Sequence, residues 1–137
     1  SLTFKVSLIY DANLSAITFF VDDYDSAIEY FTTVLNFTLT EDKVTGENSR
    51  FVLVTPPHSA TSLLLAQAKN DTEMALIGRQ AADKVFLILN TDDFWRDYNA
   101  MQSKGVAFLE TPREEVYGTV AIFRDKFGNK WDLIQTT

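Results

Sequence analysis

The 137-residue sequence contains no cysteine, and this absence excludes several classes of protein. Without thiols there can be no cysteine nucleophile, no cysteine-bound zinc and no disulfide framework. Histidine occurs once, as His58, which follows two prolines in a predicted turn. A lone histidine in such a turn is typically solvated, so a Ser-His-acid or Cys-His catalytic arrangement has little support.

The chain also lacks long apolar runs, glycine-rich phosphate motifs and clusters of basic residues. No stretch approaches the roughly 20 apolar residues of a membrane span, and no signal peptide is evident, so we expect a cytoplasmic protein without membrane contact. Five scattered glycines form neither a Walker nor a Rossmann motif. The formal net charge of -7 would repel a phosphate backbone, and we expect no nucleic-acid partner.

What the chain does contain is a pattern that repeats at an offset of 70 residues. Residues 16–21 and 85–89 are apolar runs typical of buried strands, and acidic residues that can cap a helix follow each run. The apolar positions of the two predicted helices both step by four, three and four. These positions are Tyr24, Ile28, Phe31 and Leu35 in the first helix, and Phe94, Tyr98, Met101 and Gly105 in the second.

The rest of each half is predicted to form three strands, so that each half is a βαβββ module. The strands expected after the first helix are 37–42, 50–55 and 61–68, and those after the second are 106–110, 117–124 and 130–135. We place both modules in one domain over residues 1–137, with module one at about 14–69 and module two at about 84–137. A linker with a short helix is expected at about 70–83, and an extra N-terminal strand at 4–10.

Two segments, Val-Asp-Asp-Tyr-Asp-Ser-Ala-Ile-Glu-Tyr-Phe at 21–31 and Phe-Arg-Asp-Lys-Phe-Gly-Asn-Lys-Trp-Asp-Leu-Ile-Gln at 123–135, carry a family resemblance. Together with the two modules, they resemble the vicinal oxygen chelate superfamily, also called the glyoxalase, bleomycin-resistance and dioxygenase superfamily. The similarity covers about residues 14–136. It implies an α+β fold in which two βαβββ modules form an eight-stranded, open, cup-shaped sheet. It also implies a homodimer.

In the metalloenzymes of this superfamily, His, Gln or Glu side chains from the first and last strands of each half hold a divalent ion. The matching positions in the first strands are Ala16 and Val85, neither of which can donate a lone pair. The last strand of module one offers leucines, with Gln67 too far along it, and only Asp132 carries an acid. Because one carboxylate cannot hold a catalytic ion, we expect no metal and no other cofactor.

Asp132 is therefore the first candidate for ligand binding, as a hydrogen-bond acceptor or counter-ion; the alternative is a structural acid paired inside the cup. Arg113 and Tyr117 lie in a loop that the resemblance places near the mouth of the cup. Arg113 could clamp an anionic group, and Tyr117 could donate a hydrogen bond. The alternative for this loop is a solvated turn with internal Arg–Glu pairs.

Strand alternation predicts which other side chains face the cup. Trp131 and Asp132 point to opposite sides, and Thr18, Phe20 and Leu87 are expected to face the cup. Such an apolar lining suits a hydrophobic or aromatic small molecule. Arg50 is a further candidate contact, with a salt bridge as its alternative. The candidate ligand-binding residues are thus Asp132, Arg113, Tyr117, Thr18, Phe20, Leu87 and Arg50.

The expected function is metal-independent binding of a small, largely apolar or aromatic molecule, similar to bleomycin-resistance-type sequestering proteins, without turnover. One alternative is a metal-dependent lyase, isomerase or dioxygenase of the same superfamily with displaced ligands. That alternative requires at least two of five side chains to converge: Gln67, His58, Asp132, Glu114 and Glu115. A further alternative is a module whose cup is filled by its own side chains, such as Phe19 and Phe20.

Overall fold

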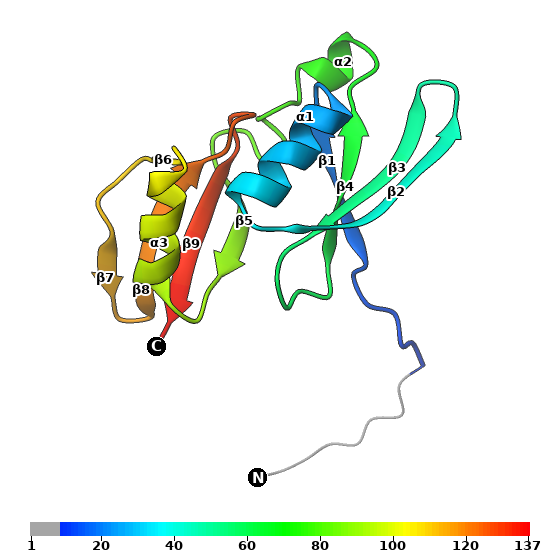
Figure 1. Ribbon diagram of the computed structural model, residues 1–137. Helices are drawn as coiled ribbons and strands as arrows, with labels where there is room; N and C mark the ends of the chain where they lie inside the picture. Colours follow the sequence, from blue (N-terminus) through cyan, green and yellow to red (C-terminus); the bar gives the residue numbers. More distant parts are fainter. Residues whose placement is uncertain (1–8) are drawn as a thin grey trace.

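The computed structural model describes residues 9–137, which form nine strands in two open sheets, together with three α-helices (Figure 1). The α+β class and the repeated strand–helix–strand order are confirmed. The extra strand expected at 4–10 falls almost wholly outside the described residues, and Ile9 and Tyr10 are not in a strand. No helix within 9–137 combines the length and apolar character needed to cross a bilayer.

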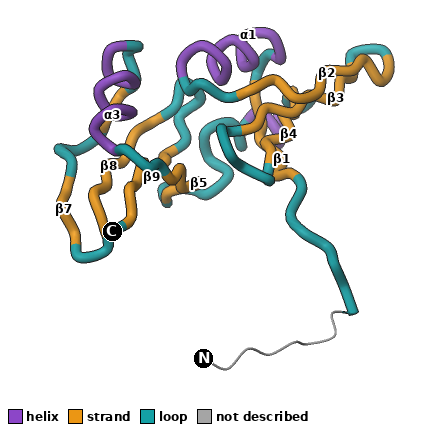
Figure 2. The backbone as a smooth tube through the Cα atoms, turned by 60° about the horizontal axis from the view of Figure 1, so that its bottom comes forward, coloured by secondary structure: helices purple, strands orange, loops and turns teal. Residues whose placement is uncertain are grey.

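The first sheet has four strands, and its long outer hairpin extends away from the second module (Figure 2). Only its first pair, β1 with β4, is parallel. In spatial order, the strands are β1 (Ala16–Val21), β4 (Ser62–Gln67), β3 (Ser49–Thr55) and β2 (Thr38–Gly46).

The helix of module one begins and ends as the sequence predicts. The side chain of Asp23 caps α1 (Tyr24–Glu29) by accepting a hydrogen bond from the Ser26 N–H at 2.8 Å. The helix continues as a π-helical segment, η1 (Tyr30–Val34), and Asn36 then adopts a φ of 61°. Because asparagine tolerates this left-handed conformation, the chain can turn directly into β2.

The second sheet has five strands, and α3 lies against it (Figure 1). β6 is shorter than the strand predicted at 106–110, and β7 forms in the segment that was predicted to be a loop. Pro112, which has no N–H to donate, lies between them. The elements are β5 (Val85–Asn90), α3 (Phe94–Ser103), β6 (Ala107–Phe108), β7 (Arg113–Glu115), β8 (Gly118–Arg124) and β9 (Lys130–Thr136).

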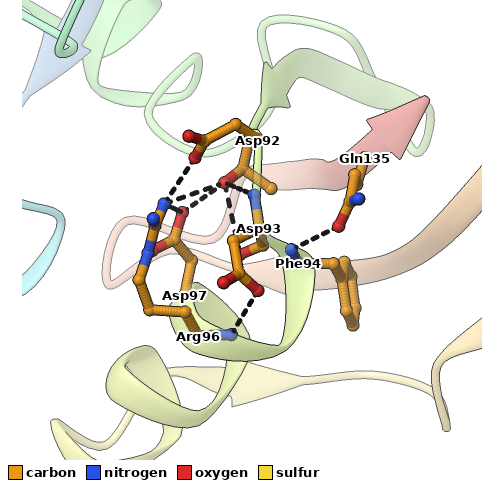
Figure 3. A network of polar contacts seen from close by, with 7 residues as sticks. Asp92, Asp93, Phe94, Arg96, Asp97 and Gln135 are labelled. Atoms are coloured by element: carbon orange, nitrogen blue, oxygen red, sulfur yellow. Dashed lines mark hydrogen bonds and ion pairs between the residues drawn. The ribbon is translucent and has the colours of Figure 1, made fainter. Parts of the chain in front are cut away.

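Polar contacts fix the start of α3 to the second sheet (Figure 3). Asp93 caps the helix by accepting from the Arg96 N–H, and Gln135 of β9 accepts from the Phe94 N–H at 2.7 Å. The Arg96 guanidinium pairs with Asp92 and Asp97, at 2.8 and 2.9 Å. The network satisfies the N–H groups of Phe94 and Arg96 at the start of the helix, without a ligand.

A single apolar core joins the helix-covered faces of both sheets. Phe31 of η1 lies at its centre, with its ring 5.3 Å from Phe19 of β1, 6.0 Å from Phe127 and 6.4 Å from Trp131 of β9. These contacts unite residues of both modules, so the two sheets are held side by side. The face of each sheet that points away from the helices is called the open face below.

The linker between the modules is also docked at two points. It contains α2 (Asp71–Met74), and Gly78 then approaches the turn after β8 so closely that a Cβ there would lie 2.2 Å from the Phe127 carbonyl oxygen. Two positions on, the Gln80 side chain accepts from the Phe20 N–H and donates to the Thr18 carbonyl, both at 2.9 Å. The linker therefore contacts both modules.

Candidate functional site

The turn between β8 and β9 determines which way the side chains of β9 point. Asp125 is 4% exposed, and its Oδ1 accepts three backbone N–H groups, those of residues 127–129, each at 2.9 Å. Its Oδ2 accepts from Asn129 Nδ2 at 3.0 Å and from Trp131 Nε1 at 2.8 Å. The Trp131 side chain is thereby held in the core, and alternation directs Asp132 to the open face.

Asp132 lies in the middle of this open face, between two aliphatic neighbours. It pairs with Ile88 on β5 and with Ile122 on β8, so the three side chains share one side of the sheet. The carboxyl group is half-buried, and no hydrogen bond or ion pair to it is found within residues 9–137. Desolvation raises its pKa; the nearby charge of Arg113 lowers it and that of Glu110 raises it.

Next to Asp132, the guanidinium of Arg113 is held by two carboxylates. Glu110 accepts from Arg113 Nε at 3.0 Å and from Nη2 at 3.3 Å, and Glu115 accepts from Nη1 at 2.7 Å. Hydrogen bonds with Glu110, Tyr117 and Glu115 raise the pKa of Arg113. The loop thus contains the internal Arg–Glu pairs that were one of its two sequence-based interpretations, and Arg113 is not free to clamp an anion.

Glu110 is a site residue that the sequence analysis missed. Besides holding Arg113, it accepts from the Ile122 N–H at 2.9 Å, in the gap between β6 and β7. That N–H would lack a strand partner there, because the ladder is interrupted before Pro112. An acid two residues before a proline in a strand was the signal that could have identified it.

The remaining candidates are distributed over both sheets. Thr18 and Phe20 pair with Leu64 and Ala66, on the open face of the first sheet, while Phe19 between them is fully buried. Tyr117, 53% exposed, is in the turn before β8, on the second sheet. The structure therefore brings Arg113 near both Asp132 and Tyr117 on the second sheet, whereas Thr18 and Phe20 belong to the first.

The expected orientation of Leu87 is wrong. A bulge between Val85 and Leu87 shifts the register of β5, so that Leu87 pairs with the buried Trp131 and packs against the core. Ile88 takes the open-face position instead and is 67% exposed. The strand reads as Val-Phe-Leu-Ile-Leu, and an unbroken apolar run carries no alternation from which the bulge could be seen.

Arg50 also faces away from the open face, and the salt-bridge interpretation describes it. Its guanidinium donates to Asp25 at 2.9 Å and to Asp42 at 2.8 Å, and it lies 5.1 Å from the centre of the Tyr24 ring. Asp25 belongs to α1, so Arg50 connects β3 to the helix. It has no part in a site on the open face.

The residues do not fit the divalent ion of the superfamily's metalloenzymes. Ala16 and Val85 provide no donor atoms, and the open-face residue of β4 opposite Thr18 is Leu64. Within residues 9–137, no group of three or more His, Asp or Glu side chains could hold a metal ion. His58, in the turn after β3, and Gln67, in β4, lie in module one, whereas Asp132, Glu114 and Glu115 lie in module two. The convergence that a displaced metal site requires is not seen among the described residues.

Two shallow grooves lie near the β2–β3 turn, away from Asp132. Their volumes are about 410 and 350 Å³, and Asn48 and Gln67 line both of them. Gln67 pairs with the buried Val21, which places these grooves on the helix side of the first sheet. Neither groove is lined by Asp132, Arg113, Glu110 or Glu115.

Comparison with known proteins gives a consistent result. The family model "Glyoxalase/Bleomycin resistance protein/Dioxygenase superfamily" matches residues 13–133. An uncharacterized protein of Shewanella frigidimarina (strain NCIMB 400) is 52% identical over 117 residues, which cover 84% of this chain and 87% of that protein. The crystal structure of UcmS2 has a TM-score of 0.77 at 27% identity, covering 91% of this chain and 98% of that one. TnmS3, an antibiotic binding protein from Streptomyces sp. CB03234, has a TM-score of 0.74 at 25% identity, covering 95% and 100%.

Proposed function

Because the chain belongs to the Glyoxalase/Bleomycin resistance protein/Dioxygenase superfamily, we propose that it binds a small, largely apolar or aromatic molecule without a metal ion. The site is the open face of the second sheet, around Asp132. This superfamily includes proteins that bind antibiotics as well as enzymes, and the similar protein TnmS3 is described as an antibiotic binding protein. Binding without turnover is the function that the donor set at the metal positions supports best.

The observation that carries this proposal is the state of Asp132. A half-buried carboxylate between Ile88 and Ile122 has lost part of its hydration, and the described residues give it no hydrogen bond in return. Groups of this kind gather at binding sites, because a ligand can supply the missing partner. The exposed aliphatic side chains around it offer the apolar contact area that most small-molecule sites use.

A homodimer is the second part of the proposal. Ile88 is 67% exposed and Phe51, on the open face of the first sheet, is 39% exposed. A second copy that covered the open faces would bury both side chains and enclose the ligand. Light scattering after gel filtration tests this, with a mass of twice 15.5 kDa expected. A single subunit mass at all concentrations up to about 100 µM would contradict it.

A cytoplasmic location stays a prediction.

A thermal-shift screen of aromatic small molecules tests the binding function. We expect several compounds to raise the Tm of the wild type in a saturable manner, and Asp132→Ala to weaken this effect. Glu114→Gln is the matched control, because Glu114 bonds Thr119 and lies on the opposite side of β7 from Arg113. Failure of every compound in a library of diverse aromatics would overturn the proposal.

Metal analysis of the same preparation, purified without chelator, tests the alternative of a metal-dependent lyase, isomerase or dioxygenase. It is repeated after exposure to Ni²⁺, Co²⁺, Zn²⁺, Mn²⁺ and Fe²⁺. We expect no tightly held ion. About one ion per subunit that is lost in Asp132→Ala would make the enzyme the better interpretation.

A further inference from the structure

We propose that the ligand carries a protonated amine, or an equivalent cationic nitrogen, on its apolar body, and that this group pairs with Asp132. The inference rests on the proposed function and assigns the ligand class of the same site. It follows from the partners that each charged side chain on this face already has.

The first step concerns the arginine beside Asp132. Arg113 does not pair with Asp132, because its guanidinium is shared by Glu110 and Glu115 at 2.7 to 3.3 Å. The three groups together carry one more negative than positive charge, and Asp132 adds another. An anionic ligand brought to Asp132 would therefore meet net negative charge at this end of the sheet.

The second step concerns the two other cations on the same face, Arg124 and Lys130. They pair with each other across β8 and β9, near the turn. Their side chains point to backbone carbonyls: Arg124 donates to Gly128 at 3.0 Å, and Lys130 donates to Asp83 of the linker at 3.1 Å. Both contacts hold the cations toward the end of the sheet, and neither side chain is hydrogen-bonded to Asp132 among the described residues.

The third step concerns what a ligand must offer. When ionised, the Asp132 carboxylate can only accept hydrogen bonds, so its partner must be a hydrogen-bond donor. A charged donor is preferred because N⁺–H···O⁻ bonds are about twice as strong as neutral ones. The apolar body of the ligand, packed against Ile88 and Ile122, would shield the pair from water. The same side chains accommodate the apolar part of the ligand.

The test uses three naphthalene probes that differ only in one group: 2-(1-naphthyl)ethylammonium, the neutral 2-(1-naphthyl)ethanol and the anionic 1-naphthylacetate. Their Kd values are measured by calorimetry at pH 7 and low ionic strength for the wild type, Asp132→Asn, Lys130→Gln and Glu114→Gln. We expect the wild type to bind the ammonium probe about tenfold more tightly than the alcohol. In Asp132→Asn this preference disappears while alcohol binding stays within about twofold, and Glu114→Gln changes neither.

Two results would overturn the inference. The first is a wild type that binds the alcohol or the carboxylate as tightly as the amine; if Lys130→Gln then weakens the carboxylate, the site is specific for anions. The second is an amine preference that survives in Asp132→Asn. Binding of none of the probes, with no hit in the thermal-shift screen, would refute the proposed function itself. Circular dichroism of each variant shows whether it is folded.

Discussion

The two modules of this protein have the same order of elements, yet only one of them carries charged groups at the centre of its open face. The inner strands of module one show only small, hydroxyl or apolar side chains there, among them Thr18, Phe20 and Leu64. The corresponding face of module two carries Asp132 and the Arg113 cluster. A repeated pattern of apolar residues thus specifies the core faces twice, whereas the chemistry of the open faces is free to differ.

The turns before the last strands differ in the same way. In module two, Asp125 satisfies five donors beneath the turn, and in module one the turn after β3 contains the exposed His58, with a φ of 60°. In module two, a buried acid therefore orients β9. In module one, the turn at the matching place lies on the surface. β9, the strand that carries Asp132, is thus the one whose orientation is fixed by a buried acid.

The largest expected effect comes from removing that acid. Asp125→Ala leaves up to five donors without their acceptor, including the buried Trp131 Nε1, and should lower the free energy of unfolding by about 4 kcal/mol. His58→Gly, at the matching turn, should change it by less than about 0.5 kcal/mol or raise it slightly, because glycine accepts a positive φ. Urea denaturation measures both. Equal effects would show that the two turns are equivalent after all.

The contact between the linker and module two should come next in size. Gly78→Ala introduces a Cβ 2.2 Å from the Phe127 carbonyl oxygen at a φ of 75°, so the backbone must shift, at a cost of about 3 kcal/mol. Gly105→Ala is the control: its φ is 87°, but no atom lies within 4 Å of the added Cβ, so only the conformational strain of about 1 kcal/mol remains. Thermal unfolding of the two variants would contradict this prediction if their Tm values were the same.

Gln80→Ala tests how the linker is fixed to module one. The side chain makes two hydrogen bonds of 2.9 Å with β1, and their loss should cost about 1 to 2 kcal/mol. Amide exchange gives the sharper measurement, because the Phe20 N–H should lose protection while the core strands keep theirs. Unchanged exchange at the Phe20 N–H would mean that the two Gln80 hydrogen bonds do not stabilise β1 in solution.

The smallest expected effect is a pH dependence that links the two modules. Burial, and then the charge of Asp125, raise the pKa of Tyr30 to about 12. In the unfolded chain, the Tyr30 hydroxyl ionises with a pKa of about 10. The contribution of neutral Tyr30 to the free energy of unfolding is therefore complete below pH 10 and is lost as the pH rises from 10 to 12. After allowance for partial exposure, the change is about 1 kcal/mol. In Tyr30→Phe the alkaline decline of stability should be shallower by that amount, and an identical pH profile would exclude the linkage.

The elements themselves could be predicted from the sequence, because they depend on local patterns. The first strand was expected at 16–21 and β1 has those bounds; the second helix was expected from Phe94 to the stop at Gly105 and α3 covers Phe94–Ser103. Cap residues and the apolar step of 3.6 are encoded within a few positions of the element they define. The repeat at 70 residues then gave the module order.

The site could be predicted only in part, because register and ion pairing are non-local. Asp132 followed from alternation along β9, but the bulge in β5 reversed Leu87 and Ile88, and nothing in an all-apolar strand marks a bulge. Arg50 finds its partners 8 and 25 positions away, across a hairpin and on a helix. Such partners become visible only when the chain is folded.

The two hydrogen bonds between Gln80 and β1 have a consequence for how another strand can pair with this sheet. A four-stranded sheet has two outer edges, and in this protein the middle of the β1 edge is already bonded by a side chain of its own linker. A foreign strand would therefore find the middle of β1 already occupied. Among residues 9–137, the outer edge of β2 has no such contact from the linker. Gln80 thus protects the β1 edge of the sheet against strand addition.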